Sequence, residues 1–309
     1  MDTEITELLQ KIKDAKRTPF WQSTPEQARS GPMLMDLLFG PAPDVARVED
    51  FSIASSNGHA LPVRLYVPRE QPRGLIVYFH GGGWVVGSVA SYHPLTATLA
   101  ARTGCAVLSV DYRLAPEHPF PLPLDDAIAA LRWSAEEAET RLGGPVARLI
   151  AMGDSAGGNL ATVAARLHNR TDTARPVDLQ ILAYPVTGHD FDTGSYQAFA
   201  EGHLLTRRDM MWFWDQYLPD PAQRDNPLAS PLHAPDLSHS PPALILSAGC
   251  DPLRDEGEAY GQRLLASGVD AQVLRCDGLV HGFLAMIHYA PSASRAFDRI
   301  LAAVDLATA

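Results

Sequence analysis

Short runs of apolar residues, each long enough for one buried strand, recur along this chain and constrain its fold more than any other feature. They lie at residues 75–79, 106–110, 149–152, 179–184, 243–247 and 271–275. Most are continuous rather than alternating, which is typical of parallel strands covered on both faces. Helical patterns separate several of them, at residues 124–142, 156–169, 253–267 and 293–307. The sequence therefore predicts an α/β fold with a mostly parallel, doubly wound central sheet and helices on both faces.

A hairpin is expected before the first buried strand. Residues 47–53 and 61–67 are strand-like. Asn57-Gly58 lies between them and is a strong signal for the turn of a β-hairpin.

One region precedes the alternation of predicted strands and helices, and a second region interrupts it. Residues 5–12 have the apolar spacing of an amphipathic helix, and a second helix starts after Thr24, where Gln27 can close a capping box. Residues 188–240 separate two strands by more than a crossover needs and contain an aromatic-rich helix at 209–217. We expect the N-terminal helices and this insertion to be two halves of a cap. The aromatic side chains are also compatible with a role as the buried face of that helix.

Composition and charge exclude several classes of protein. Apolar residues make up 46% of the chain and charged residues 20%, which is ordinary for a globular protein. The formal net charge is −11 and no dense basic run occurs, so we expect no nucleic-acid partner. No apolar run reaches the roughly 18 residues that a membrane span needs, and the N-terminus lacks the apolar core of a secretory signal. We expect a cytoplasmic protein without a membrane span, for which a homodimer is one compatible state.

The cysteines and histidines show no pattern of a disulfide framework or a metal site. Cys105, Cys250 and Cys276 are too few and too scattered for disulfides, and we expect Cys105 and Cys276 in the core. Neither H-E-x-x-H nor C-x-x-C is present, nor any tight cluster of His and Asp. The sequence therefore predicts no metal and no cofactor.

Ser155 is the candidate nucleophile. It is the centre of Gly153-Asp-Ser-Ala-Gly157, a G-x-S-x-G pattern between a predicted strand and a predicted helix. A sharp strand-to-helix turn leaves room only for small residues on either side of the serine, and it lifts Oγ out of the sheet. The N-terminus of the following helix favours negative charge that develops there.

A glycine loop follows the strand at 75–79. Its sequence is His80-Gly-Gly-Gly-Trp84. Glycines allow backbone N–H groups to converge on one point, which an oxyanion requires. A plain glycine turn and a phosphate-binding loop are the alternatives, but neither G-x-x-x-x-G-K-[ST] nor G-x-G-x-x-G is present. Together with the serine turn downstream, the loop favours an oxyanion hole.

An acid and a base follow the serine in the order that this architecture requires. A serine hydroxyl needs a base, and the base needs an acid to orient it. Asp251 follows the strand at 243–247 and His281 follows the strand at 271–275. Both lie where an open α/β sheet places its site, beyond the carboxyl ends of its strands. The competitors are Asp255 and Glu256, expected within the next helix, Asp277 and His288.

At this point the chain resembles the bacterial hormone-sensitive-lipase family of α/β-hydrolase esterases. The matching segments are His80–Trp84, Asp111–Pro119, Gly153–Gly158, Asp251–Asp255 and His281–Phe283, in the family's order. The resemblance implies that Ser155, Asp251 and His281 form a catalytic triad. It also implies an oxyanion hole from the N–H groups of Gly82, Gly83 and Ala156, with Gly81 shaping the loop.

The resemblance further implies the domain organisation and the activity. We expect N-terminal cap helices at 1–46, an α/β-hydrolase catalytic domain at 47–187 and 241–309, and a cap insertion at 188–240. The expected activity is hydrolysis of short- to medium-chain acyl esters through an acyl-enzyme. A non-enzymatic small-ligand receptor on the same fold and an amide or carbamate hydrolase are the alternatives. Candidate pocket residues, each also compatible with the core, are Trp84, Tyr184, Phe191, Leu204, Met210, Met211, Trp212 and Phe213.

Overall fold

The computed structural model describes residues 1–15, 18–30, 38–171 and 173–309. In this part of the chain, one sheet contains eight strands in the order β1-β2-β4-β3-β5-β6-β7-β8. The strands are β1 (Arg47–Ala54), β2 (Ala60–Val67), β3 (Leu75–Phe79), β4 (Ala106–Val110), β5 (Leu149–Asp154), β6 (Leu179–Ala183), β7 (Ala243–Cys250) and β8 (Ala271–Val280). β2 pairs antiparallel with β1 and β4, and every other pair is parallel. The predicted fold class is confirmed.

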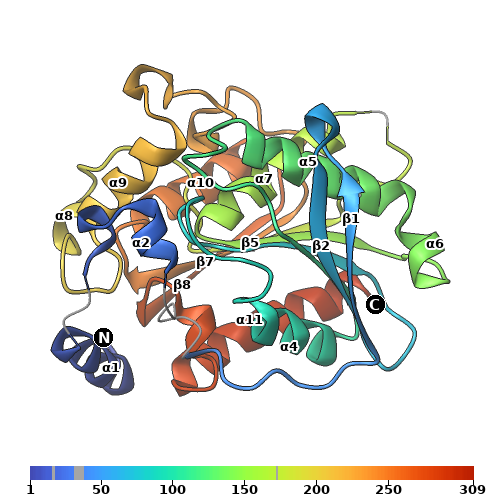
Figure 1. The fold of residues 1–309 in the computed structure, drawn as a ribbon, viewed down its shortest axis with the longest axis horizontal. Helices are drawn as coiled ribbons and strands as arrows, with labels where there is room; N and C mark the ends of the chain where they lie inside the picture. The colour runs from blue at the N-terminus through green and yellow to red at the C-terminus, as the bar shows by residue number, and fades with distance from the viewer. Residues whose placement is uncertain (16–17, 31–37, 172) are drawn as a thin grey trace.

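Helices cover both faces of the sheet (Figure 1). α5 (Leu122–Glu136), α7 (Ala156–Asn169) and α10 (Arg254–Ala266) lie on one face, and α4 (His93–Thr103) and α11 (Pro291–Ala307) lie on the other. Neighbouring residues of β3 accordingly enter different cores, Ile76 on the side of α4 and Val77 on the side of α5. All five residues of β3 are buried, which explains its continuous apolar run.

The structure differs from the sequence prediction at several element boundaries. The apolar stripe at 124–142 forms two helices, α5 and α6 (Ala138–Leu142), because Glu137 leaves helical geometry at φ −122°. Both helices keep the stripe on the buried side, so the spacing does not reveal the break. β7 and β8 extend further than predicted, and Asp277 therefore lies inside β8. Since β8 is an edge strand, Cys276 is only partly buried, whereas Cys105 is fully buried.

The N-terminal segment contacts both β8 and the insertion. α1 (Thr3–Asp14) begins beside β8, where the Asp2 N–H donates to the Gly278 carbonyl at 3.0 Å. The 3-10 turn η1 (Phe20–Gln22) packs against α9 (Arg207–Tyr217), and the Trp21 N–H donates to Asp209 at 3.2 Å. α2 (Pro25–Arg29) has the predicted capping box and lies beside α9 in Figure 1.

The insertion also contains α8 (Gly194–Ala198) and the 3-10 turns η3 (Pro221–Gln223) and η4 (Pro231–His233). At the opposite end of the sheet, the turn between β1 and β2 is the predicted hairpin, with Asn57 at φ 56°. Among the described helices, none is long and apolar enough to cross a membrane.

Candidate active site

Ser155 occupies a strained turn between β5 and α7. Its backbone has φ 54° and ψ −121°, a conformation that a residue with a side chain rarely adopts. A Cβ on Gly153 would overlap the Gly157 carbonyl, and a Cβ on Gly157 would overlap the Phe79 carbonyl. The two glycines of the pattern are therefore required by contact with the backbone on either side of the serine.

The structure brings Ser155, His281 and Asp251 into one hydrogen-bonded chain. His281 Nε2 lies 3.0 Å from Ser155 Oγ, and His281 Nδ1 lies 2.8 Å from Asp251 Oδ2. Asp251 is fully buried and its other oxygen accepts from the Leu253 N–H at 3.0 Å. Because a carboxylate only accepts, the proton on His281 belongs on Nδ1, which leaves the Nε2 lone pair facing Ser155.

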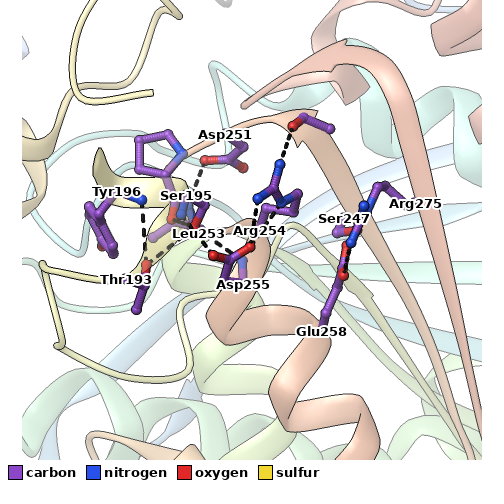
Figure 2. A network of polar contacts seen from close by, with 12 residues as sticks. Thr193, Ser195, Tyr196, Ser247, Asp251, Leu253, Arg254, Asp255, Glu258 and Arg275 are labelled. Atoms are coloured by element: carbon purple, nitrogen blue, oxygen red, sulfur yellow. Dashed lines mark hydrogen bonds and ion pairs between the residues drawn. The ribbon is translucent and has the colours of Figure 1, made fainter. Parts of the chain in front are cut away.

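A polar network below Asp251 ties the acid-bearing loop to the insertion (Figure 2). Ser195 of α8 donates its hydroxyl to the Pro252 carbonyl at 2.6 Å and its N–H to Asp255 at 2.7 Å. Arg254 donates to the same Asp255 at 2.9 Å. Ser195 thus holds the residues on the carboxyl side of Asp251 through both its hydroxyl and its N–H.

The competing acids and the second histidine have other contacts. Asp255 and Glu256 fall within α10 as predicted, and Glu256 accepts from the Thr187 N–H at 2.7 Å. Asp277 and His288 are both exposed. In the described residues, Asp251 is the carboxylate that hydrogen-bonds to His281.

The glycine loop lies against the nucleophile with its backbone in unusual geometry. Gly82 and Gly83 have φ 114° and 59°, and both line the same cavity as Ser155. Ala156 is buried at the first position of α7. None of the hydrogen bonds among the described residues uses the N–H of Gly82, Gly83 or Ala156. These donors are therefore free for an oxyanion.

Asp154 holds the loop and was not singled out from the sequence. It is buried, and it accepts from the Gly81 N–H at 2.9 Å, Tyr78 at 2.7 Å and Tyr92 at 3.1 Å. Burial raises the pKa of Asp154, against the hydrogen bonds from the two tyrosines. Asp154 occupies a variable position of G-x-S-x-G, so the pattern itself gave no reason to select it. A carboxylate next to the nucleophile was the available signal.

Residues of the segment after β4 hydrogen-bond to the glycine loop and hold its backbone in place. The Tyr112 hydroxyl donates to the His80 carbonyl at 2.7 Å, and the Ala115 N–H donates to the Trp84 carbonyl at 2.8 Å. The His80 ring stacks on Tyr112, and burial lowers the pKa of His80, which favours the neutral imidazole.

A cavity of about 260 Å³ opens above Ser155 and His281. Its apolar wall comes from both segments that the sequence predicts as a cap. The N-terminal segment contributes Ile12, Pro19 and Phe20, and the insertion contributes Leu204, Met210 and Phe213. Sequence reasoning missed the N-terminal contributors, because a short amphipathic helix does not show which side chains reach a site far along the chain.

The structure corrects part of the predicted pocket wall. On α9, Met210 and Phe213 are one turn apart and face the cavity. Met211 is 40% exposed, and Trp212 packs beside Phe20 with ring centroids 6.3 Å apart, so neither lines the cavity among the described residues. Helical periodicity turns these two side chains away from the face that their neighbours occupy.

Three further pocket candidates are not among the described residues that line the cavity. Trp84 is fully buried and stacks on Tyr217 at 4.1 Å. Tyr184 is buried and packs against His281 at 4.7 Å between ring centroids. Phe191 packs edge-on against Tyr196. Leu204, the remaining candidate, lines the cavity.

Comparison with known proteins gives a consistent result. A family model described as alpha/beta hydrolase fold matches residues 76–285. The chain is similar to ethyl acetate hydrolase of Pseudomonas putida, with 42% identity over 81% of this chain and 80% of that protein. It is 40% identical to carboxylic ester hydrolase LipN of Mycobacterium tuberculosis, over 85% of this chain and 72% of LipN. A hyperthermophilic esterase from the archaeon Pyrobaculum calidifontis superposes with a TM-score of 0.91 at 34% identity, covering 100% and 99% of the two chains.

Proposed function

The chain is a carboxylic ester hydrolase of the hormone-sensitive-lipase-like family with the α/β hydrolase fold, and we propose that Ser155, His281 and Asp251 carry its chemistry. One observation supports this assignment most. His281 reaches Ser155 Oγ with one ring nitrogen and the buried Asp251 carboxylate with the other. A serine hydroxyl is a weak nucleophile until a base removes its proton, and a carboxylate keeps that base in the required tautomer.

In the acylation step, His281 Nε2 takes the proton from Ser155 Oγ as the oxygen attacks the ester carbonyl carbon. The N–H groups of Gly82, Gly83 and Ala156 stabilise the oxyanion that forms, and Asp251 stabilises the imidazolium. The bond from the carbonyl carbon to the alcohol oxygen then breaks. The alcohol leaves with the proton from His281, and the acyl group stays on Ser155.

Deacylation repeats the sequence with water as the nucleophile. His281 takes a proton from the water as its oxygen attacks the acyl carbon, and the same N–H groups bind the second oxyanion. The bond to Ser155 Oγ breaks, and the serine recovers its proton from His281. The carboxylic acid is released. Deacylation therefore consumes one water molecule and regenerates the free enzyme.

The substrate class follows from the cavity. A volume of about 260 Å³ is small beside the ~300–1,000 Å³ of pockets that hold drug-sized ligands. Its apolar wall suits a hydrocarbon chain, and the similar Pseudomonas protein is an ethyl acetate hydrolase. We propose short- to medium-chain acyl esters as substrates, with residues 1–46 and 188–240 as the cap that sets the length.

A panel of p-nitrophenyl esters of increasing acyl length, with the matching p-nitroanilides, tests the proposal. We expect rapid hydrolysis of short and medium esters, slow hydrolysis of anilides, and loss of activity in Ser155→Ala with an unchanged circular dichroism spectrum. Binding without turnover would favour a receptor, and faster anilide hydrolysis would favour an amide hydrolase. Full activity in Ser155→Ala would contradict the assignment.

A homodimer is also part of the proposal. β8 is an edge strand of the sheet, and an edge strand leaves backbone donors and acceptors available to a second chain. Light scattering on the purified protein measures the mass directly.

A further inference from the structure

Three metal-ligating side chains from distant parts of the insertion meet away from the catalytic cavity. His189 lies in the loop after β6, Asp225 follows η3, and His233 ends η4. Their ligand atoms all lie within 4.8 Å of one another, and in the described part of the chain no other group of His, Cys, Asp or Glu is placed in this way. The lack of a metal pattern in the sequence does not bear on this group, because its members are far apart along the chain.

The distances are close to those of a zinc site. His233 Nδ1 lies 2.8 Å from Asp225 Oδ1, and His189 Nε2 lies 3.9 Å from the same oxygen. A tetrahedral Zn²⁺ with bonds of about 2.0–2.2 Å holds neighbouring ligand atoms about 3.3–3.6 Å apart. The two separations lie on either side of this range, and the two exposed side chains, Asp225 and His233, are the ones that would rotate to reach it.

We propose that His189, Asp225 and His233 bind one zinc-like divalent cation, with water at the remaining position. Two imidazoles and one carboxylate are a donor set that suits zinc. Binding replaces the contact between His233 Nδ1 and Asp225, and the neutral His233 ring then carries its one N–H proton on Nε2.

The backbone around the ligands is held before any ion binds. The Leu232 N–H donates to the Thr187 carbonyl at 2.8 Å, which joins the two ends of the insertion. The Arg263 guanidinium donates to the Ala234 carbonyl at 2.6 Å. The backbone on both sides of His233 is therefore hydrogen-bonded to neighbouring segments.

A second contact orients His189. Ser230 donates its hydroxyl to the Arg224 carbonyl at 2.6 Å, so its oxygen is left to accept from His189 Nδ1, 3.5 Å away. This leaves the Nε2 lone pair of His189 facing Asp225, as a metal ligand requires.

Charge and access also fit a cation. The nearby Arg224 guanidinium is paired with Asp215 at 2.6 Å, which offsets its repulsion of an ion. The Asp225 side chain is 75% exposed, so a hydrated ion reaches the site from solvent.

The ion would act on the insertion and not on the ester. None of the three ligands lines the catalytic cavity among the described residues. His189 lies at the start of the insertion, and Asp225 and His233 lie on its return. A cation that joins them closes the insertion at its base, and the inference is independent of the proposed catalytic roles.

The test is Zn²⁺ titration of the full-length protein after treatment with a chelator and desalting. Isothermal calorimetry should show saturable uptake of one Zn²⁺ per chain, with a rise in melting temperature on adding Zn²⁺. Asp225→Asn and His233→Ala should each weaken binding by about tenfold or more and remove that rise. His239→Ala changes an exposed histidine on the same return segment and should bind as the unaltered protein does.

Circular dichroism and hydrolysis of a p-nitrophenyl ester verify that each variant is folded. No saturable uptake, or equal uptake by the unaltered protein and both ligand variants, would overturn the proposal and leave the cluster as an ion pair.

Discussion

The carboxylate of Asp154 accepts a hydrogen bond from the Gly81 N–H at 2.9 Å, so the residue before the nucleophile holds the loop that carries the oxyanion donors. The same carboxylate accepts from Tyr78 and Tyr92, which lie on and beyond β3. The position of Ser155 and that of the glycine loop are therefore set by one buried group.

Replacing Asp154 should damage both activity and stability. Asp154→Ala leaves the Gly81 N–H and two tyrosine hydroxyls without their acceptor, at a cost of about 1–3 kcal/mol each for buried groups. We expect kcat to fall by roughly 10²-fold, as for a lost oxyanion donor. Asp154→Asn retains an acceptor for Gly81 and should lose less. Steady-state kinetics and urea unfolding measure the two effects, and an unchanged kcat in Asp154→Ala would show that the loop does not depend on this contact.

Contact between Gly83 and Phe213 should limit substitution in the loop. A Cβ on Gly83 would overlap the Phe213 ring, and φ 59° adds backbone strain. Gly83→Ala should therefore lower kcat/KM by about 10²-fold. Adding Phe213→Ala removes the overlap but not the strain, so the double variant should recover part of the loss. A double-mutant cycle on kcat/KM measures the coupling, and strictly additive effects would refute it.

Two adjacent methionines offer a matched test of the cavity wall. Met210 is 1% exposed and lines the cavity, whereas Met211 is 40% exposed and does not. Met210→Ala should raise the ratio of kcat/KM for an octanoyl ester to that for a butanoyl ester by roughly tenfold. Met211→Ala should leave the ratio unchanged. Equal shifts in the two variants would place the wall elsewhere.

Glu256 should make stability depend on pH. Burial raises the pKa of Glu256 to about 8, against hydrogen bonds from the Thr187 and Gly188 N–H groups. Between its ordinary pKa in the unfolded chain and about 8, the folded protein binds more protons at this site than the unfolded chain, so this group lowers the free energy of unfolding as pH rises.

Glu256→Gln keeps an acceptor for both N–H groups and removes the titration. Its stability relative to the unaltered protein should therefore increase from pH 5 to about pH 8. Urea unfolding at several pH values measures the difference. A constant difference across this range would mean that Glu256 does not titrate there.

The sequence predicts the limits of an element where the residues within and beside that element determine them. β3 has the predicted limits because Gly74 and His80 flank its apolar run, and β4 ends as predicted because Asp111 follows Val110. α7 begins at Ala156 as predicted, because the serine turn fixes its start. The carboxyl end of β8 was missed because Asp277 and Gly278 interrupt the apolar pattern, and pairing with β7 extends the strand through them.

The residues of the site likewise differ in whether local sequence or long-range packing determines their position. Ser155, Asp251 and His281 follow strands, and the order of strands in a doubly wound sheet is enough to expect them at one edge. Which side chains of α9 face the cavity depends on how that helix lies against η1 and the glycine loop, so Met211 and Trp212 were predicted on the wrong face. The meeting of His189 with Asp225 and His233 depends on the path of the whole insertion, which no local pattern specifies.

Covalent labelling tests the central assignment most directly. A p-nitrophenyl phosphonate should release one equivalent of p-nitrophenolate per active chain, abolish esterase activity, and leave one adduct on the peptide that contains Ser155, as mass spectrometry identifies. His281→Ala should slow the labelling strongly, because the serine loses its base. An adduct on any other residue, or full esterase activity after Ser155 is labelled, would contradict the account.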